Sequence, residues 1–219
     1  MSSSLIQLLV LAGIALFLIL CLRDVLGTRE GFEKPVVTRK DDRRLGRDQL
    51  EVIEGGPDSD ITDHVPEGSA AAHALAAMKG AEPSFSVSEF LGGARGAYEM
   101  ILMGFEAGDM AQIKPFLADD VYETFASVIE ARENKGLTVE AKFVGLREMK
   151  LVDAAYDPDT GEGEVTVRFI GELTSVVRDK GGDVIEGNPN EVKRQKDVWT
   201  FARIMGSDNP NWQLVATGG

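Results

Sequence analysis

The feature that most constrains this chain is an unbroken apolar run near its N-terminus, LIQLLVLAGIALFLILCL, over residues 5–22. The run contains one Gln and no charged residue, so a helix formed by it is apolar on every side. At about 1.5 Å of rise per residue, that helix spans roughly 27 Å, close to the ~30 Å hydrocarbon core of a bilayer. A helix also satisfies its own backbone hydrogen bonds, as a segment in lipid must. We therefore predict a transmembrane anchor over residues 1–26.

Three other interpretations of the run fit less well. A cleavable signal peptide needs a basic start and a small-residue cleavage site, but MSSS precedes the run and LCLR closes it. A lipoprotein signal would place a small residue before the cysteine, where this chain has Leu20. A buried core helix is the third alternative, and the all-round hydrophobicity of the run together with the charge that flanks it argues against that alternative. Within the span, Cys21 is expected to be an apolar filler, with palmitoylation as the alternative.

Charge flanks the apolar run on one side alone. Residues 23–47 hold eight basic and five acidic residues, and no basic residue precedes the run. The positive-inside rule then places the N-terminus outside and the C-terminal part in the cytoplasm. We expect a single-pass protein of the inner (cytoplasmic) membrane, and a bacterial one because no Arg-rich, acid-poor presequence is present. Whether the basic segment also attracts anionic lipid or only sets the topology stays open. The candidate membrane-surface contacts are Arg39, Lys40, Arg43, Arg44 and Arg47.

The rest of the chain is acidic, and the formal net charge is -13. This balance argues against nucleic acid as a partner, since nucleic-acid binding needs a basic footprint. Residues 48–82 are rich in Gly, Pro, Ser and acids without a sustained apolar period, so we predict a basic juxtamembrane segment and acidic flexible linker over 27–83. Within it, AAAHALAAMKG is able to form a short helix on contact with a partner. His64 and His73 are expected to be solvated.

Residues 84–219 begin with helical patterns. Ser86-Val87-Ser88-Glu89 is a capping box, and apolar residues then recur every three or four positions up to Phe105. Gly108 is the expected end of this helix. A short second helix is expected from Asp109, and a third from about residue 120 to 135.

The pattern changes from helix to strand after Gly136. We expect strands over 143–151, 165–173, 192–204 and 212–216, separated by turn residues. Helices followed by sequential strands predict an α+β domain over 84–219, with helices packed on one face of a curved antiparallel sheet.

Little in this domain supports catalysis. Residues 84–219 contain no His and no Cys, which removes the commonest general base and thiol nucleophile. Asp109, Asp119 and Asp120 lie where helices begin, so capping explains them. The stretch GGARG at 92–96 lies inside a helix without a phosphate-loop ending, and we expect its small residues to let the helix approach the sheet closely. We predict no enzyme, no cofactor and no metal.

The aromatic residues of the domain are first of all a predicted core, and a curved sheet under helices also leaves room for an apolar pocket at its open end. The candidate pocket residues are Tyr98, Phe105, Phe125, Phe169, Trp199, Phe201 and Trp212. Two basic clusters on strands offer a second binding surface if those strands pair. They are Lys142, Arg147, Lys150 and Lys193, Arg194, Lys196. Binding through the pocket is favoured over binding through charge.

Three stretches of the domain resemble the Tim44-like domain family: FLGGARGAYEMILMGFEAGD at 90–109, DVWTFAR at 197–203 and NPNWQLVATGG at 209–219. The anchor with GTREGFEKP at 27–35 is similar to the alphaproteobacterial branch of that family. The family includes a mitochondrial inner-membrane translocase subunit. The resemblance implies a cone-shaped fold like that of nuclear transport factor two, with a hydrophobic pocket, affinity for anionic membranes and no enzymatic activity.

Together, the anchor and the resemblance predict a membrane-anchored, non-enzymatic adaptor or scaffold at the cytoplasmic face of the inner membrane. Its expected partner is a protein, namely a chaperone, a translocase or a nascent membrane protein, and membrane lipid is the second expected partner. The alternative is a small-ligand or lipid-binding protein, or an enzyme, that uses the apolar pocket of the cone.

Overall fold

The computed structural model of this chain describes residues 57–218. Within that range no helix is long and apolar enough to cross a membrane. The predicted anchor over 5–22 and the candidate membrane-surface contacts lie outside the described residues, and they stay predictions. Those contacts are Arg39, Lys40, Arg43, Arg44 and Arg47.

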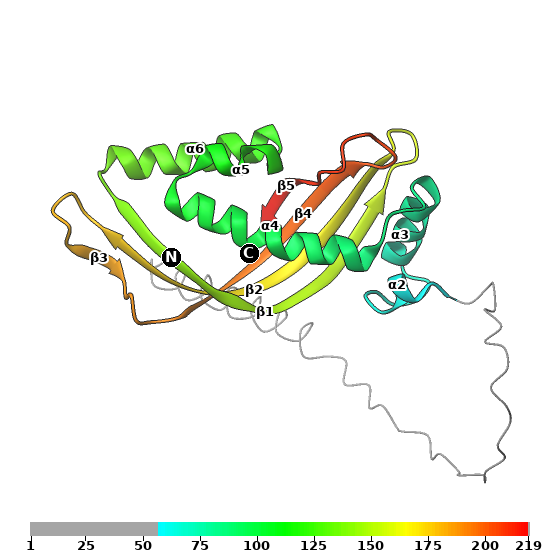
Figure 1. Ribbon diagram of the computed structural model, residues 1–219, viewed down its shortest axis with the longest axis horizontal. Helices are drawn as coiled ribbons and strands as arrows, with labels where there is room; N and C mark the ends of the chain where they lie inside the picture. The colour runs from blue at the N-terminus through cyan, green and yellow to red at the C-terminus, as the bar shows by residue number, and fades with distance from the viewer. Residues whose placement is uncertain (1–56, 219) are drawn as a thin grey trace, which may run out of the picture. The chain divides into compact units, whose positions relative to one another are not determined.

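A curved antiparallel sheet carries helices on one of its faces (Figure 1). Its main strands lie in the order β1-β2-β4-β5, and a short strand, β3, also pairs with β2. The strands are β1 Thr138–Tyr156, β2 Glu162–Arg178, β3 Val184–Gly187, β4 Lys193–Ile204 and β5 Gln213–Gly218. The helices over the sheet are α4 Val87–Ala107, α5 Met110–Ile113, the 3-10 turn η1 Lys114–Phe116, and α6 Asp119–Asn134. The α+β architecture expected from the sequence is confirmed.

The core lies between β2 and α4. Val165, Val167 and Phe169 alternate along β2 and have no exposed surface, as the period of two predicts. Tyr98 and Ile101 of α4 are likewise fully buried against this face.

Helix α4 begins and ends as its sequence predicts. The Ser86 hydroxyl accepts a hydrogen bond from the backbone N–H of Glu89 at 3.3 Å, which satisfies one of the free donors of the first turn. At the other end Gly108 takes the left-handed conformation, with φ of 75°, and its N–H bonds to the last turn. The helix therefore crosses the sheet as one 21-residue element.

Strand β1 is much longer than the expected strand over 143–151. Its pairing with β2 shifts register at three places, between Phe143 and Gly145, between Leu146 and Glu148, and between Leu151 and Asp153. Each such bulge inserts a residue and reverses the alternation, so the apolar period stops being readable although the strand continues. The structure also contains β3, which the sequence analysis did not predict, because all four of its residues are exposed and carry no buried face.

The expected close approach of the GGARG stretch to the sheet is wrong. A Cβ added at Gly92, Gly93 or Gly96 would meet nothing within 4 Å, so these residues face open space. The close approach along α4 is instead at Gly104, and it is to α5 rather than to the sheet, because a Cβ there would overlap Cγ2 of Ile113.

The expected flexible linker over 27–83 is wrong from residue 58 onward, and what precedes residue 57 lies outside the described range. Residues 59–62 form α2 (Ser59–Thr62) and residues 70–81 form α3 (Ala70–Ala81), which packs against β1. Leu75 and Met78 of α3 are fully buried in the core. Half of the buried residues of α3 are alanine, which gives too weak an apolar period to recognise in the sequence.

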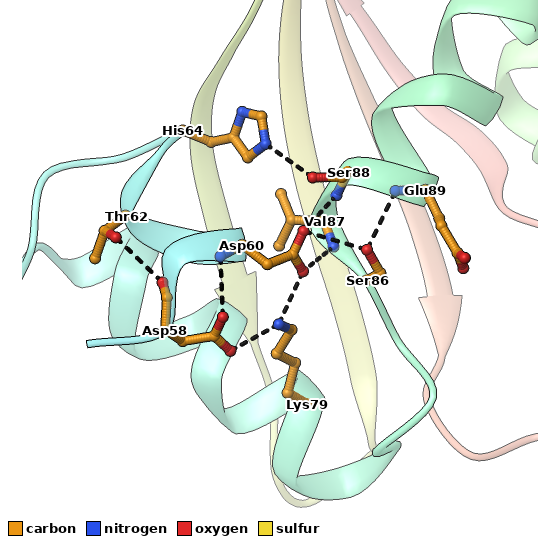
Figure 2. Close-up of polar contacts among 9 residues, drawn as sticks. All are labelled: Asp58, Asp60, Thr62, His64, Lys79, Ser86, Val87, Ser88 and Glu89. Atoms are coloured by element: carbon orange, nitrogen blue, oxygen red, sulfur yellow. Dashed lines mark hydrogen bonds and ion pairs between the residues drawn. The ribbon is translucent and has the colours of Figure 1, made fainter. Parts of the chain in front are cut away.

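Asp60 of α2 joins this segment to the start of α4 (Figure 2). Its carboxylate accepts hydrogen bonds from the backbone N–H of Val87 at 2.8 Å and of Ser88 at 2.9 Å, and it lies 2.8 Å from the ammonium of Lys79. Burial raises the pKa of the Asp60 carboxyl, but the hydrogen bonds from Lys79 and from the start of α4 outweigh burial and hold that pKa well below its usual range. His64 Nε2 lies 3.3 Å from the hydroxyl of Ser88, so it too contacts the domain.

Candidate functional site

A groove of about 320 Å³ lies where the first half of α4 meets β4 and the turn before β5. Its apolar lining is mostly aromatic, so we call it the aromatic groove. The aromatic lining residues are Phe85, Phe90, Phe116, Phe201 and Trp212. Polar groups at its rim come from Glu82, Glu89, Arg203 and Asn211. A concave apolar surface with a few polar groups is the usual form of a binding site.

The aromatic rings hold one another in fixed orientations. Trp212 lies 4.7 Å from Phe90 and 5.8 Å from Phe85, measured between ring centroids. Phe90 in turn packs edge-on against Phe201 at 6.0 Å. Phe85, Phe90 and Phe201 are buried, whereas Trp212 is half-buried and borders the opening. The floor of the groove is therefore rigid and apolar.

One wall of the aromatic groove is made of small residues of α4. Gly93, Ala94 and Ala97 line it, and no atom stands within 4 Å of the position that a Cβ of Gly93 would occupy. A ligand can therefore approach the backbone of α4 closely on this side.

The polar end of the groove is built around Arg203. Its side chain is only 9% exposed, and its Nη2 donates to the Glu82 carboxylate at 2.8 Å. The same carboxylate accepts a hydrogen bond from the backbone N–H of Gly206 at 2.8 Å. That bond is the largest effect on the pKa of Glu82 and lowers it; burial raises the pKa, and the bond from Arg203 lowers it further. The guanidinium also lies 5.2 Å from the centroid of the Trp212 ring. Arg203 is thus held in place by an acid and an aromatic ring together.

The two ionised groups of the polar end are engaged with each other. Arg203 and Glu82, both at the rim of the groove, form an ion pair with each other. The Nε of Arg203 is buried and has no hydrogen-bond partner among residues 57–218. Residues 57–218 also contain no group of three or more His, Cys, Asp or Glu side chains placed to hold a metal ion.

The structure divides the candidate pocket residues among three places. Phe201 and Trp212 line the aromatic groove. Phe105 and Phe125 form a separate pair 4.6 Å apart, with the Arg132 guanidinium 4.5 Å over the Phe105 ring. The remaining three lie together in the buried core: Tyr98, Phe169 and Trp199.

The buried group contains a polar pair that does not face a cavity. The Tyr98 hydroxyl donates to the Asp197 carboxylate at 2.7 Å, and Gln195 donates to the same carboxylate at 3.1 Å. Burial and the neighbouring carboxylate raise the pKa of Tyr98 far above its usual value. A Cβ at Gly171 would stand only 2.6 Å from the Tyr98 hydroxyl, so the space beside the pair is filled. The pair therefore satisfies a buried hydroxyl.

Sequence reasoning missed Phe85, Phe90, Phe116 and Arg203 as parts of the site. Phe85 and Phe90 flank the capping box in the positions of a hydrophobic staple. That pattern predicts that the two rings contact each other, and it does not indicate a surface for a ligand. Arg203 had a readable signal, because it continues the inward alternation of Trp199 and Phe201 along β4.

Comparison with known proteins places this chain in a family. The Tim44-like domain matches residues 71–219. The human mitochondrial import inner membrane translocase subunit TIM44 is 27% identical over 118 residues, which are 52% of this chain and 25% of that protein. TIM44-1 of Arabidopsis thaliana, named as the same kind of subunit, is 20% identical over 197 residues, which are 84% of this chain and 40% of that protein.

The chain thus spans between a quarter and two fifths of the length of these relatives. Among solved structures, the intermembrane space region of the chloroplast protein ARC6 matches with a TM-score of 0.33 and 11% identity, over 50% of this chain and 75% of that one. From the match over residues 71–219, this chain belongs to the Tim44-like domain family.

Proposed function

We propose that this chain is a membrane-anchored, non-enzymatic adaptor that binds a protein partner through the aromatic groove. The observation that carries the proposal is the groove itself, which is rigid, apolar and open along Gly93. The relatives are named as subunits of a mitochondrial import translocase, which supports a role in protein translocation or in membrane-protein biogenesis. A chaperone, a translocase subunit or a nascent membrane protein fits this role.

The size of the groove suits side chains of a protein. A volume of about 320 Å³ lies at the low end of small-ligand sites and accommodates one or two large apolar side chains. The small residues on the α4 wall let a partner backbone come close, and the rim groups Glu89 and Asn211 are placed to bond its polar atoms. Aromatic pockets of this kind supply most of the affinity at many protein interfaces.

The anchor and its orientation belong to the same proposal. A span over 5–22 with the domain in the cytoplasm would hold the groove near the inner face of the membrane. Alkaline carbonate should leave the protein in the membrane pellet, and a cytoplasmic fluorescent reporter at the C-terminus should be active. Release by carbonate, or activity of a periplasmic phosphatase fused there instead, would overturn this part.

The groove is tested by filling it. Gly93→Trp places a large side chain at the groove, and its Cβ starts in open space because nothing lies within 4 Å of that position. Gly96→Trp is the matched control, since Gly96 is equally free of contacts on α4 but does not line the groove. A photoreactive residue at Asn211 of the full chain should crosslink a protein in intact membranes, and Gly93→Trp should abolish that crosslink while Gly96→Trp leaves it. Equal crosslinking in both variants would reject the groove as the docking site.

The alternative is that the groove holds a lipid or another apolar small molecule, which its aromatic lining favours. Under that alternative, Gly93→Trp reduces flotation of the protein with anionic liposomes even at raised salt, and no protein crosslink forms at Asn211.

A further inference from the structure

Basic side chains gather on the face of the sheet turned away from the helices. The strand register places them there, because Arg168 pairs with Lys150 of β1 and with Val198 of β4, and all three point opposite to the buried Phe169. The same alternation and the ion pairs described next assign six cations to this outer face. We call them the basic band: Lys142, Arg147, Lys150, Arg168, Arg194 and Lys196.

The two basic clusters predicted from sequence meet across β2 in this band, with one exception. Glu172 of β2 lies 3.0 Å from Arg194 of β4 and 3.6 Å from Arg147 of β1, so it joins the two clusters. Lys193 is the exception, since it pairs with the inward-facing Leu173 and lies on the helix side of the sheet.

The basic band carries more positive charge than its own acids neutralise. Glu172 and Glu148 lie among the six cations, and Glu148 pairs with Arg168. A third carboxylate, Asp153, lies at one end of the band, where it pairs with the outward-facing Thr166 and lines the same hollow as Lys150. Lys142, Lys150 and Lys196 are exposed and form no ion pair with any residue between 57 and 218. The excess is notable because the chain as a whole carries a net charge of -13. The basic band is therefore a local region of an acidic protein that is attractive to anions.

We propose that the basic band binds an acidic segment of a partner protein. The guanidinium groups of Arg147, Arg168 and Arg194 are already fixed by the two carboxylates, so they present N–H donors in set directions that suit further carboxylates. The unpaired lysines add attraction at longer range.

Apolar side chains beside the band define the partner more closely. Val144 is 52% exposed and Val198 is 36% exposed, and Ile170 lies half-buried between Glu148 and Lys196. The segment that fits has acidic residues interspersed with aliphatic ones. A membrane surface fits less well, because such contacts usually use Trp and Tyr, and within residues 57–218 none of the side chains that the register directs outward is aromatic.

This surface is independent of the aromatic groove. The groove lies on the helix side of the sheet and the basic band on the opposite side, so each can fail without the other. If both act, the domain holds two partner segments at once.

The test uses the purified full chain and a fluorescein-labelled peptide of Glu and Asp with interspersed Leu. The control peptide carries Gln and Asn in place of the acids. Fluorescence anisotropy should show binding of the acidic peptide alone, weakening as salt rises because exposed charges are screened. The combined Lys142→Glu, Lys150→Glu, Lys196→Glu variant should weaken binding by about tenfold or more.

A matched charge reversal away from the band is Lys114→Glu, Lys135→Glu, Lys180→Glu, which changes the net charge equally and should alter binding by no more than about twofold. Circular dichroism checks that both variants remain folded. No binding of the acidic peptide at low salt, or equal loss in both variants, overturns the proposal. If the band variant instead loses binding to phosphatidylglycerol vesicles while the peptide never binds, the surface contacts lipid and the proposal is wrong.

Discussion

Alanine at three glycines of α4 should stabilise the protein. Gly92, Gly93 and Gly96 lie in the interior of the helix, none has a positive φ, and a Cβ at each would meet nothing within 4 Å. Glycine in a helix interior costs roughly 0.5–1 kcal/mol relative to alanine, chiefly because the unfolded chain has more freedom to lose at glycine. The triple variant should therefore gain about 1.5–3 kcal/mol in the free energy of unfolding.

For a domain of this size, each kcal/mol raises the melting temperature by about 2–4 °C, so the triple variant should melt roughly 3–12 °C higher. Gly104→Ala is the contrasting change in the same helix. Its Cβ would stand 2.4 Å from Cγ2 of the fully buried Ile113, and such overpacking costs about 1–3 kcal/mol.

Thermal and urea denaturation followed by circular dichroism measures both changes in the full chain. An unchanged or lower melting temperature of the triple variant would show that the helix does not gain from these methyl groups. A Gly104→Ala protein as stable as the wild type would show that α4 and α5 are not packed as closely as the structure has them.

Three further substitutions test polar contacts in the domain. Asp60→Asn should cost about 1–2 kcal/mol at neutral pH through the lost cap on α4. Because the folded-state pKa of Asp60 is lowered, its contribution is fully present above about pH 4 and is lost progressively as the pH falls from there towards the folded-state pKa. Wild-type and variant stabilities should therefore converge in strong acid, and parallel curves would contradict this. Arg203→Met should lower the free energy of unfolding, measured by urea denaturation, by about 2–4 kcal/mol, because it leaves the mostly buried Glu82 carboxylate without its ion-pair partner. An unchanged free energy of unfolding would mean that water solvates the pair. Tyr98→Phe should lower the free energy of unfolding by about 1–2 kcal/mol, because it removes the hydroxyl that donates a hydrogen bond to Asp197. An unchanged denaturation midpoint would mean that water contacts that carboxylate.

The elements that the sequence predicts well are those whose signal is local and regular. The capping box of Ser86 and the alternation of Val165, Val167 and Phe169 each depend on neighbours within a few residues, and the structure confirms both. The extent of β1 was not predictable, because its bulges reverse the alternation and are themselves set by the curvature of the sheet.

The aromatic groove was not predictable as a set of residues, because its lining comes from segments that are far apart in the chain. Trp212 meets Phe90 only when the turn before β5 returns to the start of α4, and neither local pattern indicates that contact. The same reasoning applies to Asp60, whose partners at Val87 and Ser88 lie 27 and 28 residues further along the chain. Aromatic residues are expected in a core, so the burial of Tyr98 and Phe169 follows from their type. Residue type alone does not distinguish these core aromatics from the aromatics that line the groove.

The bonds between Asp60 and the first turn of α4 also decide how this domain meets mechanical load. Tension on the chain ahead of residue 58 arrives first at α2, and it then passes through the N–H groups of Val87 and Ser88 to the first turn of α4. Load that reaches an edge strand opens hydrogen bonds one after another, but load on α4 must act on the whole row of side chains that this helix buries in the core. A pull from the N-terminal side therefore enters the domain at the start of α4 and is resisted by the core as a unit.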